Sequence, residues 1–216
     1  AAKVTGDFAG LNTLYYTNKA NFSNLGNENV DITAATSALN VDTILKATTG
    51  VVKAEVTDAK ANILVSQLKN ANAKDDLDIT VLTDANGTSA KDLIALTKKT
   101  SLIVDASDIK AQGIDGSVAD INAVIKAEAD LKLDLNAAVA YSVTGTITAA
   151  QANAIAKETN GVVTATVAAD TAAKLVTALA DVTGGLDVLT LKVNGATAEA
   201  LDLINLNTNK TAGKIT

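Results

Sequence analysis

Apolar and polar residues alternate in several short stretches of the chain. In VVKAEV, residues 51–56, Val52, Ala54 and Val56 share one set of alternating positions, and a lysine and a glutamate lie between them. Successive side chains of a strand point to opposite faces of its sheet. The pattern therefore predicts a strand with one covered face and one solvated face.

Two other stretches predict strands of differing burial. LKLDLN at 131–136 alternates cleanly, which predicts that its three leucines face inward: Leu131, Leu133 and Leu135. LDVLTLKV at 186–193 alternates less cleanly, and we expect this strand to be covered on both faces.

The stretches between the predicted strands have helical features. In SVADINAVIKAEADL, residues 117–131, apolar residues recur at spacings of three and four, which predicts an amphipathic helix. Thr148 followed by Gln151 forms a capping-box pattern, typical of a helix start. The lysine doublet at 98–99 is expected at a solvated helix end. Turns are predicted at Asn86-Gly87, Asn160-Gly161, Gly184-Gly185 and Asn194-Gly195.

The sequence contains an internal repeat. TGVVKAEVTDAKANILVSQL at 49–68 aligns without gaps with NGVVTATVAADTAAKLVTAL at 160–179, with 9 identities in 20 positions. Three shorter pairs flank this match in the same order: ITAA at 32–35 and 147–150, LDIT at 77–80 with LDVL at 186–189, and DLIALTKKT at 92–100 with DLINLNTNKT at 202–211. A unit of about 75 residues therefore occurs twice, displaced by about 110 residues.

Val-rich runs recur at a shorter period, mostly every 20 to 26 residues. A β-then-α unit of this length fits a stack in which each unit contacts only its neighbours, and it also fits two compact domains. We favour compact α/β modules in tandem. In these modules Ala, Val and Leu side chains pack the helices against sheets that are partly solvated on one face. The predicted parts are an N-terminal aromatic arm or capping unit at 1–29, a first module at 30–106, a connecting β-α unit at 107–144 and a second module at 145–216.

The composition excludes several kinds of chemistry. Of 216 residues 48% are hydrophobic but only 2% aromatic, so the core has to be built from small aliphatic side chains. The chain has no Cys, His, Met, Trp, Pro or Arg. It therefore has no thiolate nucleophile or disulfide, and it lacks the commonest general base and transition-metal ligand. We expect no enzymatic activity.

Charge and hydropathy also narrow the range of partners. The formal net charge is −6, which disfavours nucleic acid and anionic membrane surfaces as partners. No apolar run approaches the roughly 18 residues that a membrane span requires, so we expect no membrane insertion.

Two acidic clusters are weak candidates for calcium binding. They are KDDLD, with Asp75, Asp76 and Asp78, and DASD, with Asp105 and Asp108. Carboxylates and loop carbonyls are the ligands that calcium uses. Neither cluster matches the twelve-residue calcium loop, and solvated acidic loops are the ordinary alternative. Calcium is the one cofactor that the sequence leaves open.

The two ends of the sequence differ from the repeats. Four of the five aromatic residues lie near the N-terminus: Phe8, Tyr15, Tyr16 and Phe22. They either close the end of the core in a degenerate unit or form an arm that docks on a neighbouring subunit. KTAGKIT at 210–216 aligns with KTSLIVD at 99–105, where the first copy enters a strand. We therefore expect an incomplete last strand, whose open edge recruits a partner through Lys214 and Ile215.

The ITAA…NGVV…LDVL pattern and its earlier copy resemble the Cys-free repeat regions of bacterial surface-layer proteins and large secreted adhesins, which are rich in Ala, Thr and Asn. The calcium-binding nonapeptides of those proteins are absent. The resemblance implies a structural role at the cell surface or outside the cell, in a surface layer, filament or adhesin built from contacts between copies. The alternative is a non-catalytic module that binds carbohydrate or another surface ligand.

Overall fold

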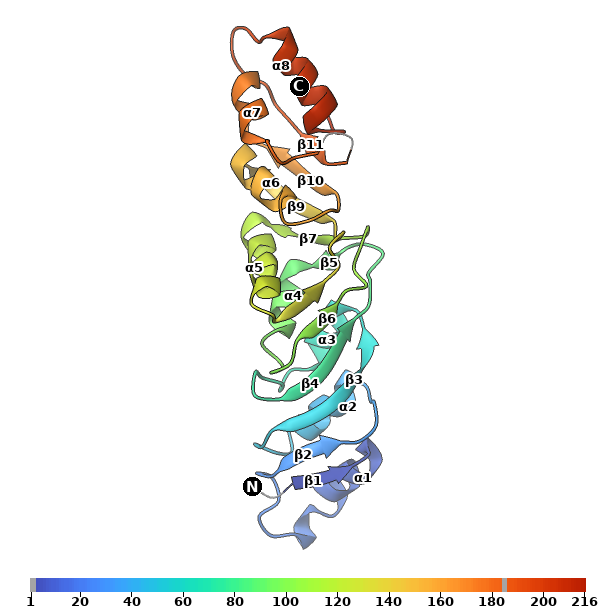
Figure 1. Cartoon of the computed structure of the whole chain (residues 1–216). Helices are drawn as coiled ribbons and strands as arrows, with labels where there is room; N and C mark the ends of the chain where they lie inside the picture. The colour runs from blue at the N-terminus through green and yellow to red at the C-terminus, as the bar shows by residue number, and fades with distance from the viewer. Residues whose placement is uncertain (1–2, 184–185) are drawn as a thin grey trace. The chain divides into compact units, whose positions relative to one another are not determined.

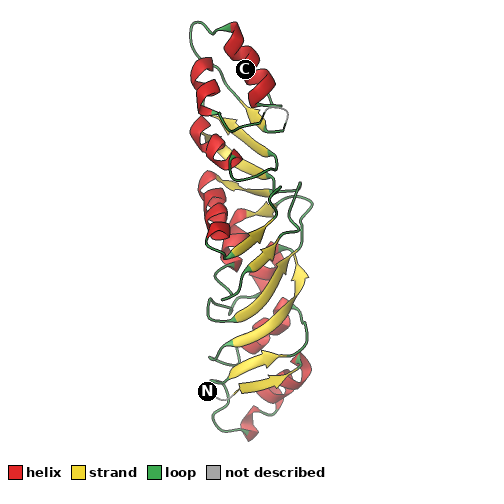
Figure 2. Cartoon of the chain, viewed as in Figure 1, coloured by secondary structure: helices red, strands yellow, loops and turns green. Residues whose placement is uncertain are grey.

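A computed structural model describes residues 3–183 and 186–216 (Figure 1). It contains two parallel β-sheets with helices between successive strands, which confirms the predicted α/β fold of β-α repeats (Figure 2). The chain forms two compact units. Unit 1 comprises the residues up to 82 with 92–108 and 127–134, and unit 2 comprises 83–91, 109–126 and the residues from 135. The predicted repeat boundaries after residues 29, 106 and 144 stay predictions, and the predicted Gly184-Gly185 turn lies outside the described residues.

The first sheet has six strands whose order follows the chain: β1-β2-β3-β4-β6-β8. The described pairs from β1 to β6 are parallel. Helices lie on one face of this sheet, with α1 packed beside α2 and α2 beside α3. The strands are β1 (Lys3–Gly6), β2 (Asn29–Ile32), β3 (Val52–Ala59), β4 (Asp76–Val81), β6 (Val104–Ala106) and β8 (Leu133–Leu135), and the helices are α1 (Phe8–Asn12), η1 (Thr13–Thr17), η2 (Lys19–Asn21), α2 (Ala38–Leu45) and α3 (Ala61–Gln67).

The second sheet has five parallel strands, in the order β11-β10-β9-β7-β5. Its helices α6, α7 and α8 pack in sequence beside one another. The strands are β5 (Thr88–Ser89), β7 (Ile114–Ser117), β9 (Tyr141–Ile147), β10 (Val163–Val167) and β11 (Val188–Thr190), and the helices are α6 (Ala149–Ala156), α7 (Ala172–Ala178), α8 (Ala200–Asn205) and η3 (Leu206–Lys210). Two further helices, α4 (Ala90–Leu96) and α5 (Val118–Ala129), contribute residues to both units.

Burial alternates along the strands as predicted. In β3 the residues Val52, Ala54 and Val56 are buried, and Lys53 and Glu55 between them are exposed. β10 repeats this pattern, with exposed threonines in place of the charged residues. Each sheet therefore buries aliphatic side chains under its helices and leaves its other face open to solvent.

The prediction that Leu131 faces inward is wrong. Its side chain is 71% exposed and its φ is 54°, in the left-handed region. The Leu131 amide donates to Glu128 O, and the Lys132 amide donates to Ala127 O at 2.8 Å. These bonds close the end of α5 in the manner of a Schellman motif, so Leu131 belongs to the helix end and the strand begins at Leu133.

The prediction for residues 186–193 is also wrong. Leu189 is buried, but Val188 and Thr190 on either side of it are exposed, so β11 is covered on one face only. β11 is the last named strand of its sheet and has the same open face as β10.

Strand pairing corrects the alignment of the short repeat blocks. Ala54 pairs with Leu77, and its equivalent Ala165 pairs with Leu189. LDIT at 77–80 therefore corresponds to LTLK at 189–192, and the predicted match with LDVL is off by three residues. The ITAA match fails in the same way. Val52 pairs with Val30, and its equivalent Val163 pairs with Tyr141. The repeat position equivalent to Ile32 is therefore Val143 and not Ile147.

Candidate functional site

The acidic clusters do not assemble a metal site. Asp75 is fully buried, whereas Asp76 accepts a hydrogen bond from the Ser101 hydroxyl and Asp78 is exposed on β4. Asp105 accepts bonds from the amide and hydroxyl of Ser107, and Asp108 lies exposed on the following turn. Within residues 3–183 and 186–216, no group of three or more acidic side chains could hold a metal ion.

Asp75 instead links two strands. Its carboxylate accepts the Val52 amide of β3 and the Asn72 amide, both at 3.0 Å. Asp187 in unit 2 does the same, accepting the Val163 amide of β10 at 2.8 Å and the Thr183 amide at 3.0 Å. A buried carboxylate that accepts two backbone amides satisfies donors that would otherwise be costly to bury. Each aspartate therefore fixes the start of one strand against its neighbour.

A threonine–any residue–glycine triplet precedes β3, β10 and the segment in which Ile215 bridges Leu191. Thr48, Thr159 and Thr211 each accept the amide of the glycine two residues later, at 3.0, 2.8 and 2.7 Å. Each also donates its hydroxyl proton to a backbone carbonyl of the preceding strand region, at Glu28, Val139 and Leu189 respectively. Thr100 plays the same part without a glycine, and it bonds to both the amide and the carbonyl of Leu77.

The glycines of these triplets let two backbones approach closely. A Cβ at Gly50 would lie 2.1 Å from Glu28 O, one at Gly161 would lie 2.4 Å from Val139 O, and one at Gly213 would lie 2.3 Å from Leu189 O. Neither Gly50 nor Gly161 has a positive φ. The turn predicted at Asn160-Gly161 thus needs its glycine for space and not for a left-handed conformation.

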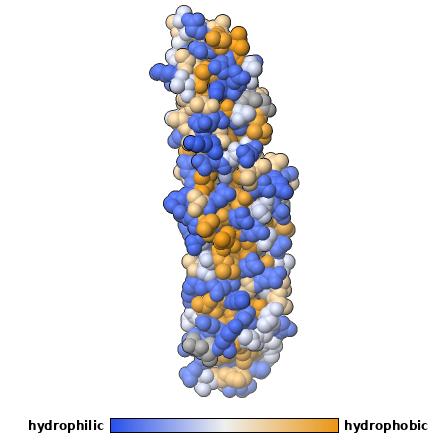
Figure 3. Space-filling model, in the orientation of Figure 1, coloured by the Kyte–Doolittle hydropathy of each residue, from blue (hydrophilic) through white to orange (hydrophobic). Residues whose placement is uncertain are grey.

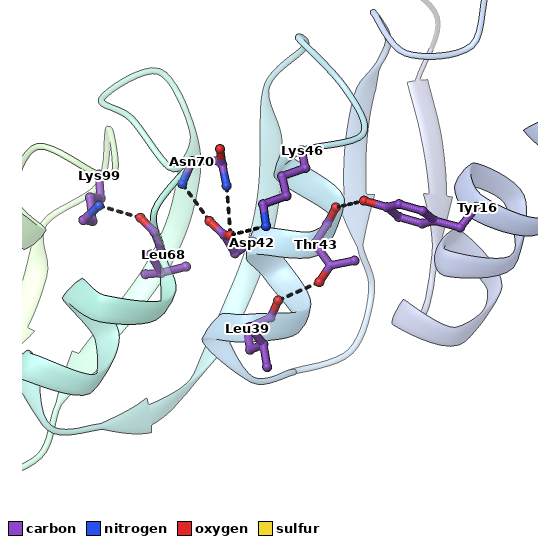
Figure 4. Close-up of polar contacts among 8 residues, drawn as sticks. All are labelled: Tyr16, Leu39, Asp42, Thr43, Lys46, Leu68, Asn70 and Lys99. Carbon is purple, nitrogen blue, oxygen red and sulfur yellow. Dashed lines mark hydrogen bonds and ion pairs between the residues drawn. The ribbon is translucent and has the colours of Figure 1, made fainter.

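Polar contacts also join consecutive helices of unit 1 (Figure 4). The Tyr16 hydroxyl of η1 donates to Thr43 O of α2 at 2.8 Å. Buried Asp42 of α2 accepts the backbone and side-chain amides of Asn70, at 2.7 and 2.9 Å. Lys99 donates to Leu68 O at the end of α3. Burial lowers the pKa of Lys99, and the charge of Asp42 opposes that shift. Of the doublet predicted at a solvated helix end, Lys98 is exposed and Lys99 is half-buried.

Unit 2 keeps the Asp42–Asn70 link with its two residue types exchanged. A shift of 111 residues carries Asp42 onto Asn153 and Asn70 onto Asp181. Asn153 Nδ2 donates to Asp181 Oδ2 at 2.9 Å, and the Asp181 amide donates to Asn153 Oδ1 at 2.7 Å. Because the exchange preserves both bonds, the pair serves to hold neighbouring helical segments together. Either of its two positions can carry the charged residue.

This exchange predicts a double-mutant rescue. Asn70→Asp alone sets two carboxylates against each other and is expected to lower the free energy of unfolding by about 1–2 kcal/mol. Adding Asp42→Asn recreates the arrangement of unit 2 and is expected to recover most of the loss. Urea unfolding of the wild type, both single variants and the double variant measures the coupling. Additive effects of the two substitutions would contradict the exchange.

A fourth buried carboxylate, that of Glu28, links the first β-α unit to the sheet. Glu28 accepts the Tyr15 hydroxyl and the amides of Gly26 and Asn27, the last two at 2.8 and 3.0 Å. Burial alone raises the pKa of Glu28, but these hydrogen bonds outweigh burial and hold the pKa below its usual value. Burial, followed by the bond to Glu28, raises the pKa of Tyr15.

Stability is therefore expected to depend on pH at this pair. Because the folded pKa of Glu28 lies below its unfolded value, its contribution is complete above the unfolded pKa and is lost as pH falls through the folded one. Tyr15→Phe is expected to cost about 1–2 kcal/mol at pH 7 and progressively less in acid. Urea unfolding between pH 7 and 3 tests this, with Tyr16→Phe as the exposed control. A Tyr15→Phe loss that stays constant down to pH 3 would exclude the linkage.

The open faces of the two sheets differ in chemistry. In unit 1 five outward positions are charged, and with nearby loop residues they line a shallow groove of about 460 Å³. In unit 2 the equivalent positions on β9, β10 and β11 are uncharged. The outward residues of unit 1 are Asp31, Lys53, Glu55, Asp76 and Asp78, and strand pairing matches them with Ser142, Thr164, Thr166, Val188 and Thr190. The duplicated strands kept their buried side and changed their solvent side.

The predicted assembly residues lie in both units. Residues 3–22 of unit 1 contain a β-α unit beside β2, in which Tyr15 is buried, Phe8 is half-buried, and Tyr16 and Phe22 are exposed. In unit 2, Ile215 bridges Leu191 in parallel, and Lys214 beside it is exposed. Their role in assembly stays a prediction.

No protein-family model matches this chain, and neither a curated protein nor a solved structure shows significant similarity to it. Among the described helices, none combines the length and apolar character needed to cross a bilayer.

Proposed function

We propose that this chain is a structural module of a bacterial extracellular assembly, such as a surface layer, filament or adhesin, and that it acts through contacts between subunits. The observation that carries the proposal is how the buried polar groups are used. Asp75, Asp187 and the triplet threonines all bond to backbone groups of neighbouring repeats within their unit. Side chains used in this way hold successive repeats together, as a structural scaffold requires.

Self-assembly is the behaviour that tests this function. The purified chain should form sheets or filaments in negative-stain electron micrographs, and its mean sedimentation coefficient should rise with protein concentration. Calcium should be varied in these measurements, since the sequence leaves it open as a cofactor. Discrete monomers at every concentration, salt and calcium level would contradict the proposal.

A second candidate function is binding of an uncharged carbohydrate on the open face of unit 2. The observation that favours it is the replacement of charged outward residues by Ser and Thr on β9 and β10. Thr164→Lys combined with Thr166→Glu would restore the residues that unit 1 carries there, at Lys53 and Glu55. If the wild type binds neutral glycans on an array, this variant should lose them, whereas binding to no glycan would rule out the candidate.

A further inference from the structure

The chain contains three Asn-Gly pairs, and the fold holds them differently. They are Asn86-Gly87, Asn160-Gly161 and Asn194-Gly195. In such a pair the main-chain nitrogen of the glycine can attack the side-chain amide carbon of the asparagine, because glycine has no Cβ to obstruct the approach. The nitrogen has to move toward the side chain, so a hydrogen-bonded and closely packed turn slows the reaction.

The Asn160-Gly161 pair is held on both sides of the peptide bond that would react. The Asn160 amide donates to Ala137 O at 2.8 Å, and the Gly161 amide donates to the Thr159 hydroxyl at 2.8 Å. A Cβ at Gly161 would lie 2.4 Å from Val139 O, so the glycine backbone is packed against a neighbouring backbone. Attack by the Gly161 nitrogen therefore requires this turn to open first.

The Asn86-Gly87 pair is held in a similar way. The Asn86 amide donates to Asp84 Oδ1 and the Gly87 amide donates to Asp84 O, both at 3.0 Å. The next amide, that of buried Thr88, donates to Gly113 O at 3.0 Å, where β5 begins. Three successive amides are therefore bonded, and the nitrogen of Gly87 is fixed within the turn.

The Asn194-Gly195 pair lies in an open bend. The Asn194 amide donates to Asp170 O at 2.9 Å, but the Gly195 amide bonds to no group in the described part of the chain. The nearest atom to a Cβ at Gly195 would be Thr197 O at 3.5 Å, an ordinary contact distance. Residues 194–199 are all exposed, and hydrophilic side chains lie at the surface in the part of the view that contains α7 and α8 (Figure 3). Neither hydrogen bonding nor packing restrains the nitrogen of Gly195, and water reaches it.

We propose that the Asn194-Gly195 bend is a site of spontaneous isoaspartate formation, and that the fold protects Asn86 and Asn160 from the same reaction. The Gly195 nitrogen bonds to Asn194 Cγ, the Cγ–Nδ2 bond breaks, and ammonia leaves with the proton that the Gly195 nitrogen gives up. One water molecule then hydrolyses the cyclic imide. Breaking the bond from the Gly195 nitrogen to the main-chain carbonyl carbon leaves isoaspartate, and breaking its bond to Cγ leaves aspartate. Water is the only co-reactant.

The fold is expected to tolerate the product. The bond from the Asn194 amide to Asp170 O and the bond from the Val193 amide to Thr216 O, at 2.8 Å, both precede the new linkage. The additional main-chain carbon of isoaspartate enters after them, in the segment before α8 begins at Ala200. Each conversion replaces a neutral amide by a carboxylate, which makes the formal net charge of −6 more negative by one unit. Aged molecules should therefore stay folded and separate from fresh ones by anion exchange.

Tryptic peptides report the three pairs separately. The chain has lysine but no arginine, and cleavage after lysine places Asn86, Asn160 and Asn194 in peptides 75–91, 158–174 and 193–210. The purified chain is aged at mildly alkaline pH, once folded and once in guanidinium chloride, and isoaspartate in each peptide is measured by enzymatic methylation and mass spectrometry. In the folded chain it should accumulate in 193–210 about tenfold or more faster than in the other two peptides. In denaturant this advantage should largely disappear, because the two protecting turns are lost.

A substitution at the reacting residue identifies the source of the isoaspartate. Asn194→Ser changes an exposed side chain, and it should abolish isoaspartate in peptide 193–210 while leaving the other two peptides unchanged. Isoaspartate that persists in 193–210 of this variant would overturn the proposal. So would a folded chain in which 75–91 or 158–174 reacts as fast as 193–210. Loss of the cooperative thermal transition in the more negatively charged fraction would contradict the expected tolerance of the fold.

Discussion

Alanine in place of Gly50 is expected to lower the free energy of unfolding by about 3 kcal/mol or more. The added Cβ would lie 2.1 Å from Glu28 O and 2.8 Å from the Asn29 amide nitrogen. Both atoms belong to the backbone that leads into β2, so no side-chain rotation relieves the overlap. Strand β3 must move away from β2, which stretches the pairing of Val30 with Val52. Urea unfolding followed by circular dichroism measures the loss.

Gly6→Ala is the matched control for this substitution. The nearest atoms to its added Cβ are side-chain carbons of Leu11 at 3.5 and 3.7 Å, an ordinary contact distance. It is expected to change the free energy of unfolding by less than about 1 kcal/mol, because only the flexibility of the unfolded chain differs. Equal losses for Gly50→Ala and Gly6→Ala would show that the close approach of backbones at Gly50 does not matter.

Periodicity in the sequence was enough to predict the layers of this fold. The alternation at Val52, Ala54 and Val56 reports which side is buried, because the covered face of β3 has to exclude charge. The capping box of Thr148 and Gln151 is present at the start of α6, since that signal is local and needs no tertiary partner. The helix predicted within 117–131 forms as α5.

Register and backbone geometry could not be predicted in the same way. The four-letter matches of LDIT and ITAA failed because Ala, Thr and Leu are too common here for short blocks to define a register. Leu131 alternates with Leu133 in sequence, but its amide bonds to Glu128 O, and it belongs to the C-terminal turn of α5. Strands β1, β7 and β9 contain Gly, Ser and Thr in place of a valine run, and the Val-rich spacing does not reveal them.

The structural links were visible in the sequence, but their roles were not. The threonine–glycine spacing occurs at Thr48, Thr159 and Thr211, and it could have been found as a third, shorter motif of the repeat. Asp75 was grouped with Asp76 and Asp78 as a calcium candidate, because adjacent carboxylates look alike in sequence. Only the fold shows that Asp75 faces the strand beside it.

Valine in place of Thr100 should have a similarly large effect. Thr100 is buried, and its hydroxyl accepts the amides of Leu77 and Leu102 at 3.0 and 3.1 Å and donates to Leu77 O at 2.7 Å. Valine matches the shape of threonine but leaves these backbone groups without that partner. At about 1–3 kcal/mol for each buried group left unsatisfied, the expected loss is about 3 kcal/mol.

The same substitution at an exposed position separates hydrogen bonding from strand propensity. Thr57→Val on the solvent side of β3 should leave stability unchanged within about 0.5 kcal/mol, because valine and threonine both suit strands. Thr211→Val in unit 2 should repeat the loss seen at Thr100, since Thr211 bonds to the amide and carbonyl of Leu189 at 2.8 Å in the same way. Hydrogen exchange should localise the damage to the Leu77 and Leu189 amides respectively. Unchanged protection of those two amides would mean that the threonines are not what joins one repeat to the next.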